Sequence, residues 1–356
     1  MFDIWLFKCI ITLVFMLFYE YNYGLDAYYY FAAPQHSTFS WIGFELGRGT
    51  SNIRQLVWLS YQVMPTSFHG LKISFALIGL AAIYLLYRST AMYLGYKDLR
   101  ILYLLGFFPS IVFWSSIFGK DPIVLLGISV YIYGVVGWGR LHKLKYIVIA
   151  AIGLLLAMLI RIWLGLIFTL PIPILILSRR GGGKFWKKAT LTVVMVISIL
   201  LSFSVVQSYF NIADSQELLE FTDKRSKSWS HGGSGQKIQG DLTQSNQALG
   251  LLPWAMFTAL FRPLPGEILN PFGLMAGLEN ALLLLLVGRA VYRNRRQDLK
   301  DPLIQWTILL VVFWAGAYGF ISYQNLGTAV RYKLQVLPIL LCLLLYLGRK
   351  QKLNRR

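Results

Sequence analysis

The stretch PIVLLGISVYIYGVVGW, residues 122–138, is 17 residues long and contains no charged side chain. A helix of this length crosses most of the roughly 30 Å hydrocarbon core of a bilayer. Its residues do not alternate between apolar and polar, as a strand of a membrane barrel would require, so only a helix can pair its backbone groups inside lipid. The stretch therefore predicts a membrane-spanning helix.

Nine further apolar runs of similar length flank this one. Hydrophobic residues make up 56% of the 356-residue chain and charged residues 14%, which is more apolar surface than a water-soluble core can bury. The sequence therefore predicts an all-α, polytopic bundle of about ten transmembrane helices. The nine other predicted spans are 3–19, 70–87, 101–118, 146–160, 163–178, 189–206, 271–288, 303–320 and 334–348.

The basic residues are distributed asymmetrically along the chain. Most of the 34 lysines and arginines follow every second predicted span, including the last one. Because positively charged loops stay in the cytoplasm, both termini are predicted to be cytoplasmic, in a plasma (inner) membrane. This pattern explains the net charge of +19 through topology and contacts with anionic lipids, so nucleic acid is not expected as a partner.

Three segments on the predicted outer side are longer than a turn requires, and they divide the chain. Residues 20–69 form a tyrosine-rich loop within an N-terminal module, 1–206, and are expected to contain amphipathic helices lying in the membrane interface. Residues 207–270 form the second outer loop, ahead of C-terminal transmembrane helices and a basic tail in 271–356. The third segment, 321–333, is short but polar.

The second outer loop has two parts of contrasting composition. Residues 226–246 are rich in Gly, Ser and Gln and predict a flexible lid or a disordered loop. Residues 248–261 are semi-apolar but interrupted by Pro253, and predict a re-entrant or surface helix that is too short to span.

Two carboxylates at the predicted outer ends of helices are candidates for catalysis. Asp26 follows the first span in a tyrosine-rich stretch, where a carboxylate can act as a base towards a hydroxyl group. Asp121 lies in a tight turn with Lys120 before Pro122, so it is either a helix N-cap or a second acidic group facing Asp26. A solvated loop aspartate is the simpler interpretation of Asp26.

Cations on the same side are candidates for binding phosphate. Arg161, Arg262 and Arg331 lie on the predicted outer side, against the positive-inside rule, with Lys120 and Lys333 nearby. Arginine binds phosphate with two parallel hydrogen bonds, so the set would suit a lipid phosphate. Snorkelling towards the headgroups explains any one of them equally well.

Other polar residues give weaker signals. Glu279 lies inside a predicted span, so it must face the bundle interior and be paired. The two cysteines and four histidines show no ligand spacing, and the chain has neither a Gly-rich phosphate loop nor an Asp-x-Asp pair. No metal or cofactor is therefore expected.

This layout resembles the GT-C superfamily of membrane glycosyltransferases. The matching features are LDAYYYFAA with its acid after the first helix, the acidic turn FWSSIFGKDP and a tight hairpin of the fifth and sixth helices. The segments FRPLPGE and NLGTAVRYKLQVLP also look like those of bacterial membrane proteins associated with polysaccharide synthesis. One departure is Ala27, because many members carry a second acid at that position.

The resemblance implies transfer of a sugar from a polyprenyl-phosphate donor to a glycan or lipid acceptor on the outer face. Asp26 would deprotonate the acceptor hydroxyl, Asp121 would assist, and Lys120, Arg161, Arg262 and Arg331 would bind the donor phosphate. Two alternatives stay open. One is a polymerase-like or ligase-like enzyme that joins lipid-linked oligosaccharides and depends on arginines. The other is a transporter of lipid or polysaccharide with no enzymatic activity.

Overall fold

A computed structural model describes most of the chain, and every regular element in the described part is a helix. The described residues are 1–24, 26–36, 43–63, 67–177, 215–230, 234–236, 245–293 and 295–349, with the single positions 189, 193, 204, 208 and 209. They divide into two compact units, Met1–Gly165 and Leu166–Arg356. The all-α expectation is confirmed, whereas nearly all of the predicted span 189–206 lies outside the described residues.

Within the described ranges, five helices are long and apolar enough to cross a bilayer, as in a multi-pass membrane protein. A sixth span is obtained if two helices that are bent by 71° are counted together. The first span combines α1 (Phe2–Ile10), the π-helix η1 (Ile11–Phe15) and α2 (Met16–Asn22). The others are α5 (Phe68–Leu94), α8 (Lys120–Leu141), α15 (Pro271–Arg293), α16 (Pro302–Ser322) and the bent pair α17 (Leu326–Lys333) and α18 (Leu337–Leu347).

The count of about ten is not confirmed, because prolines divide some of the predicted spans. The run 101–118 is broken into α6 (Leu99–Phe107) and α7 (Pro109–Trp114), with the residue before the proline in an extended conformation. The run 163–178 becomes α10 (Ile162–Thr169) and α11 (Ile172–Leu177) on either side of Pro171. The apolar composition of a segment indicates that it is buried in lipid, but it does not indicate whether the segment forms one continuous helix.

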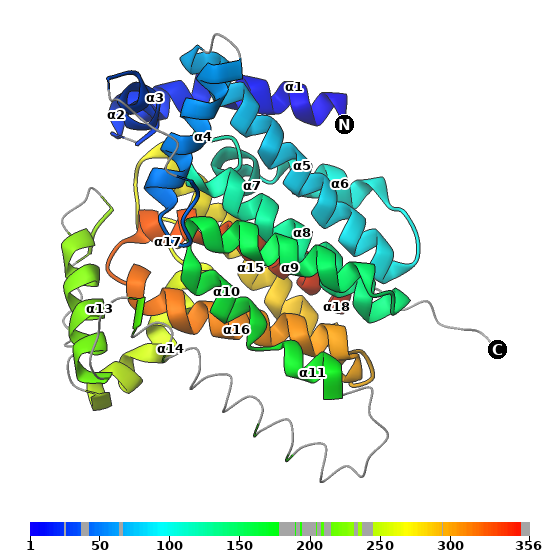
Figure 1. Ribbon diagram of the computed structural model, residues 1–356. Helices are drawn as coiled ribbons and strands as arrows, with labels where there is room; N and C mark the ends of the chain where they lie inside the picture. Colours follow the sequence, from blue (N-terminus) through cyan, green and yellow to red (C-terminus); the bar gives the residue numbers. More distant parts are fainter. Residues whose placement is uncertain are drawn as a thin grey trace. The chain divides into compact units, whose positions relative to one another are not determined.

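Glycines bring α8 and α9 (Lys145–Ile160) together in the first unit, where the two helices run side by side (Figure 1). A Cβ added at Gly134 would lie 2.4 Å from the backbone nitrogen of Ala150, and one at Gly153 would lie 2.2 Å from that of Tyr131. Small residues allow such backbone-to-backbone packing in membrane helices. Residues 146–160, the first half of the predicted hairpin, thus pack closely along α8.

Alanine at Gly134 is expected to destabilise the first unit by about 1–3 kcal/mol, because its methyl group meets backbone that cannot move aside. Thermal unfolding in detergent measures the change. Gly316 in α16 is the matched control, since nothing lies within 4 Å of a Cβ added there. Gly316→Ala should leave the unfolding temperature unchanged or slightly raised, and equal effects of the two substitutions would contradict the packing described.

A buried lysine holds the turn that precedes α8. Lys8 on α1 is fully buried and donates hydrogen bonds to Ser115 Oγ at 2.7 Å and Ser116 Oγ at 2.8 Å. A Cβ added at Gly79 on α5 would lie 1.9 Å from the Ser115 carbonyl oxygen, so α5 packs directly on the same turn. The turn that leads into Lys120 and Asp121 is thereby fixed by two spans.

In the second unit, α14 (Ser245–Phe261) packs on α16 and α17, and α15 packs on α18. A Cβ added at Gly319 of α16 would lie 2.8 Å from the Ala255 carbonyl carbon, which shows how closely α14 and α16 approach. Residues 248–261 are helical, as predicted, and their re-entrant or surface position stays a prediction. The predicted flexible segment 226–246 is wrong at its start, because α13 (Ser215–Trp229) continues through Ser226–Trp229. The charged and polar side chains of 215–229 recur at helical spacing. The Gly, Ser and Gln content of 226–246 as a whole did not indicate that its first residues continue this helix.

Candidate functional site

The tyrosine-rich loop caps the end of α9. Met158 O accepts a hydrogen bond from Gly47 N at 2.9 Å, and Leu159 O accepts one from Asn52 Nδ2 at 2.5 Å. Gly49 lies so close to Ile160 that an added Cβ would be 2.6 Å from its carbonyl oxygen. The last carbonyls of a helix have no partner within the helix, so the loop satisfies groups that would otherwise be unpaired.

This contact brings three helix ends of the first unit together. The loop leads into α4 (Gly49–Val63), the predicted amphipathic helix, whose second residue is Thr50. Thr50 Oγ1 accepts a hydrogen bond from Lys120 Nζ, at the start of α8, at 2.7 Å. Arg161 directly follows α9 and pairs with Asp121 of α8 at 3.3 Å, with both side chains buried.

A tyrosine connects these residues to Asp26. Tyr30 is buried on α3 (Ala27–His36), and its hydroxyl donates a hydrogen bond to Asp26 Oδ2 at 3.1 Å. The ammonium group of Lys120 lies 5.9 Å from the centre of the Tyr30 ring. Asp26 itself is exposed. We call Asp26, Tyr30, Thr50, Lys120, Asp121 and Arg161 the first-unit polar cluster.

The members of this cluster differ in what they can do. Asp26 is an exposed carboxylate held by one hydroxyl, so it can accept a proton from a bound group. Arg161 was expected to bind phosphate, but its guanidinium is buried against Asp121, and the pair therefore holds α8 to the end of α9. Lys120, half-buried beside an exposed threonine, is the cation of the cluster with access to the surface.

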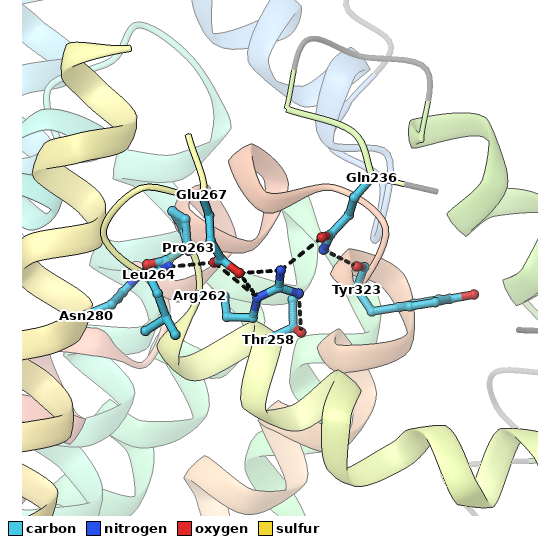
Figure 2. Close-up of polar contacts among 8 residues, drawn as sticks. All are labelled: Gln236, Thr258, Arg262, Pro263, Leu264, Glu267, Asn280 and Tyr323. Carbon is cyan, nitrogen blue, oxygen red and sulfur yellow. Dashed lines mark hydrogen bonds and ion pairs between the residues drawn. The ribbon is translucent and has the colours of Figure 1, made fainter. Parts of the chain in front are cut away.

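A second group of charged residues lies around Arg262 in the second unit (Figure 2). Arg262 is buried and bonds both Glu267 oxygens, with Nε at 2.8 and 3.1 Å and Nη2 at 2.5 Å. Glu267 Oε2 also accepts a hydrogen bond from Leu264 N at 2.6 Å. The ion pair closes the loop after α14 in FRPLPGE, so Arg262 shapes this loop.

The same loop is tied to the bent pair of helices. Asn280 of α15 donates a hydrogen bond to Pro263 O at 2.8 Å and accepts one from Lys333, at the end of α17. All three side chains of Glu279, Asn280 and Lys333 are buried, as expected for Glu279. Arg331, on α17, is half-buried. The two segments FRPLPGE and NLGTAVRYKLQVLP are thus connected through one asparagine.

The structure divides the six predicted site residues between the two units. Asp26, Lys120, Asp121 and Arg161 belong to the first-unit polar cluster, whereas Arg262 and Arg331 belong to the second unit. Sequence reasoning placed Asp26 among tyrosines without singling out Tyr30, and it missed Thr50, Glu267 and Asn280 as partners. The usable signals were Tyr30, four residues after Asp26, and Glu267, five residues after Arg262 in one short loop.

Among the described residues, no group of three or more His, Cys, Asp or Glu side chains could hold a metal ion. Comparison of the chain with protein-family models gives no match, and comparisons with curated proteins and with solved structures give none either. The class that the molecule itself defines is a helical protein with several apolar helices that could cross a membrane. The two groups of polar residues are its candidate functional sites.

Proposed function

We propose that the protein is a membrane glycosyltransferase that moves a sugar from a polyprenyl-phosphate donor to an acceptor hydroxyl on the outer face of the plasma membrane. The observation that supports this best is the first-unit polar cluster. It places an exposed carboxylate, Asp26, and a surface-accessible cation, Lys120, on either side of Tyr30. In this proposal both termini and the basic loops are cytoplasmic.

Each residue has a separate role in the proposed reaction. Asp26 takes the proton of the acceptor hydroxyl as its oxygen attacks the anomeric carbon of the donor. The bond from that carbon to the phosphate oxygen breaks, and Lys120 stabilises the negative charge of the leaving polyprenyl phosphate. Asp121 and Arg161 fix the start of α8, on which Lys120 lies. The proposal requires no metal ion.

The direct test is transfer by the purified protein in proteoliposomes. A membrane extract of lipid-linked sugars labelled in the sugar is supplied with acceptor glycans from the same cells. Release of unlabelled polyprenyl phosphate together with a labelled product is expected. If label moves between leaflets without release of polyprenyl phosphate, the protein is a transporter and the proposal fails.

A second candidate function is supported by the group around Arg262. An enzyme that joins lipid-linked oligosaccharides would use arginines more than carboxylates. Arg262 belongs to the polar contacts of the second unit, and Arg331 lies on α17 two residues before Lys333, which bonds Asn280. Retained transfer in Asp26→Asn, with loss in Arg331→Ala, would favour this joining reaction over transfer of a single sugar.

A further inference from the structure

Three residues between α13 and α14 dock on the turn between α16 and α17. Gly235 pairs with Asn325 in an isolated antiparallel β-bridge. On either side of this pair, Gln236 N donates to Gln324 O at 2.9 Å and Leu326 N donates to Ser234 O at 3.1 Å. We call Ser234–Gln236 the strap.

The side chains of the strap are also held. Ser234 Oγ donates to Asn325 Oδ1 at 3.0 Å. A Cβ added at Gly327 would lie 2.4 Å from Ser234 Oγ, so the glycine leaves the room that the strap needs. The strap therefore fits this turn closely, although it presents no apolar side chain to it.

The Gln236 amide group lies between the turn and Arg262 (Figure 2). Its nitrogen donates to Tyr323 O at 2.8 Å, and its oxygen accepts from Arg262 Nη2 at 3.0 Å. Two carboxylate oxygens of Glu267 take the other strong bonds of the guanidinium, and Thr258 Oγ1 lies 3.4 Å from Nη1. Among the described residues that bond Arg262, Gln236 thus is the acceptor that comes from a separate segment of the chain.

A neutral amide oxygen is a weaker partner for a buried guanidinium than an anionic oxygen, because the anion adds a direct attraction between opposite charges. Phosphate is an anion that arginine binds readily. The Trp254 ring lies 4.7 Å from the Arg262 guanidinium carbon and is exposed, so a bound group would also find an aromatic surface beside the cation. The position of the Gln236 oxygen is suited to an anionic oxygen.

We infer that the strap covers a phosphate-binding site on Arg262, and that a phosphate-bearing ligand displaces the Gln236 amide when it binds. This inference rests on the second candidate function, because a lipid-linked oligosaccharide bound near Arg262 supplies the phosphate. The ligand replaces a hydrogen bond, and no covalent bond changes. The strap and the ligand compete for one guanidinium.

Competition predicts opposite effects for two substitutions of the same residue. Gln236→Ala removes the competing acceptor and should tighten binding of a polyprenyl monophosphate in detergent micelles by about fivefold. Gln236→Glu gives Arg262 a charged internal partner and should weaken binding by at least as much. Equilibrium binding of the radiolabelled probe measures both. Gln305→Ala is the matched control, because Gln305 bonds a backbone carbonyl and no arginine.

A reversible lock tests the same point without altering Gln236. Residues opposite each other in an antiparallel bridge have Cα atoms close enough for a disulfide, so Gly235→Cys with Asn325→Cys can join the strap to the turn. Cys9 and Cys342 are replaced by alanine in both this variant and its parent. Oxidation should weaken probe binding and a reductant should restore it, while the parent responds to neither.

The outcomes separate this inference from the proposed function. The strap is not a cover if both Gln236 variants lose affinity for the probe or if neither changes. It is also not a cover if locking leaves the affinity unchanged, or if no form of the protein binds the probe. Inorganic phosphate competing as well as the polyprenyl probe assigns the site to a free anion and overturns the lipid-borne ligand. If the expected binding changes are measured but no form of the protein transfers sugar, the inference about the strap stands and the proposed glycosyltransferase activity fails.

Discussion

Asp121→Asn is expected to destabilise the first unit by about 3–5 kcal/mol, the usual effect of removing one partner from a buried ion pair. Arg161 and Asp121 are both buried, at 3.3 Å, so an uncharged amide leaves the guanidinium without its carboxylate. The loss should appear as a lower unfolding temperature in detergent and a smaller yield of folded protein. Replacing both residues by apolar side chains of similar volume should restore much of the stability.

Asp98→Asn is the matched control for this substitution. Asp98 also pairs with an arginine, but Arg100 is exposed and the asparagine can still cap α6. The hydrogen bonds from Arg100 hold the pKa of Asp98 below its usual value, but water screens this exposed pair. No measurable change in unfolding temperature is expected. If Asp121→Asn and Asp98→Asn behave alike, the Asp121–Arg161 pair does not hold α8 to α9.

Asp26→Asn is expected to lower the rate of sugar transfer by about 10²–10⁴-fold while the protein remains folded, as for loss of a general base. The side chain is exposed and keeps a group that can accept a hydrogen bond from Tyr30, so packing should not change. The fall should appear in kcat, with little change in the KM for the donor, because the carboxylate acts on the acceptor hydroxyl.

The chain offers a close control for this second substitution. Asp3 is also an exposed aspartate that accepts a hydrogen bond from a tyrosine hydroxyl, that of Tyr103 at 3.3 Å, but it lies at the other end of the first span. Asp3→Asn should transfer sugar at the unaltered rate. Equal activity in Asp26→Asn and the parent protein would exclude Asp26 as the base.

The apolar runs predicted the class of fold because lipid imposes helical pairing on any long uncharged segment. They did not predict where helices break. Pro109 and Pro171 lie within runs whose average composition is that of a span, and each divides its run into two short helices. The buried Lys8 was visible in the sequence, but its partners Ser115 and Ser116 lie more than 100 positions away and depend on the path of the chain.

The candidate site was predictable as a set of unusual charges but not as a set of pairs. Helix ends on one side of a membrane bundle must lie at one surface, which is why Asp26 and Lys120 could be associated from topology alone. Whether an arginine is open to a ligand depends on its nearest carboxylate. Arg161 and Arg262 each have one, supplied by Asp121 and Glu267, but Arg262 also bonds the neutral amide of Gln236, which a ligand can replace.

The loop that caps α9 has a consequence for the surrounding lipid. A 16-residue helix rises about 24 Å, some 6 Å less than the hydrocarbon thickness of a typical bilayer. Where α9 crosses the bilayer, the backbone of Gly47 and the amide of Asn52, which bond its last carbonyls, are therefore expected to lie below the level of the headgroups. Beside such a helix the membrane is expected to thin, so the polar head of a lipid-linked molecule can approach Asp26 and Lys120 without leaving its leaflet.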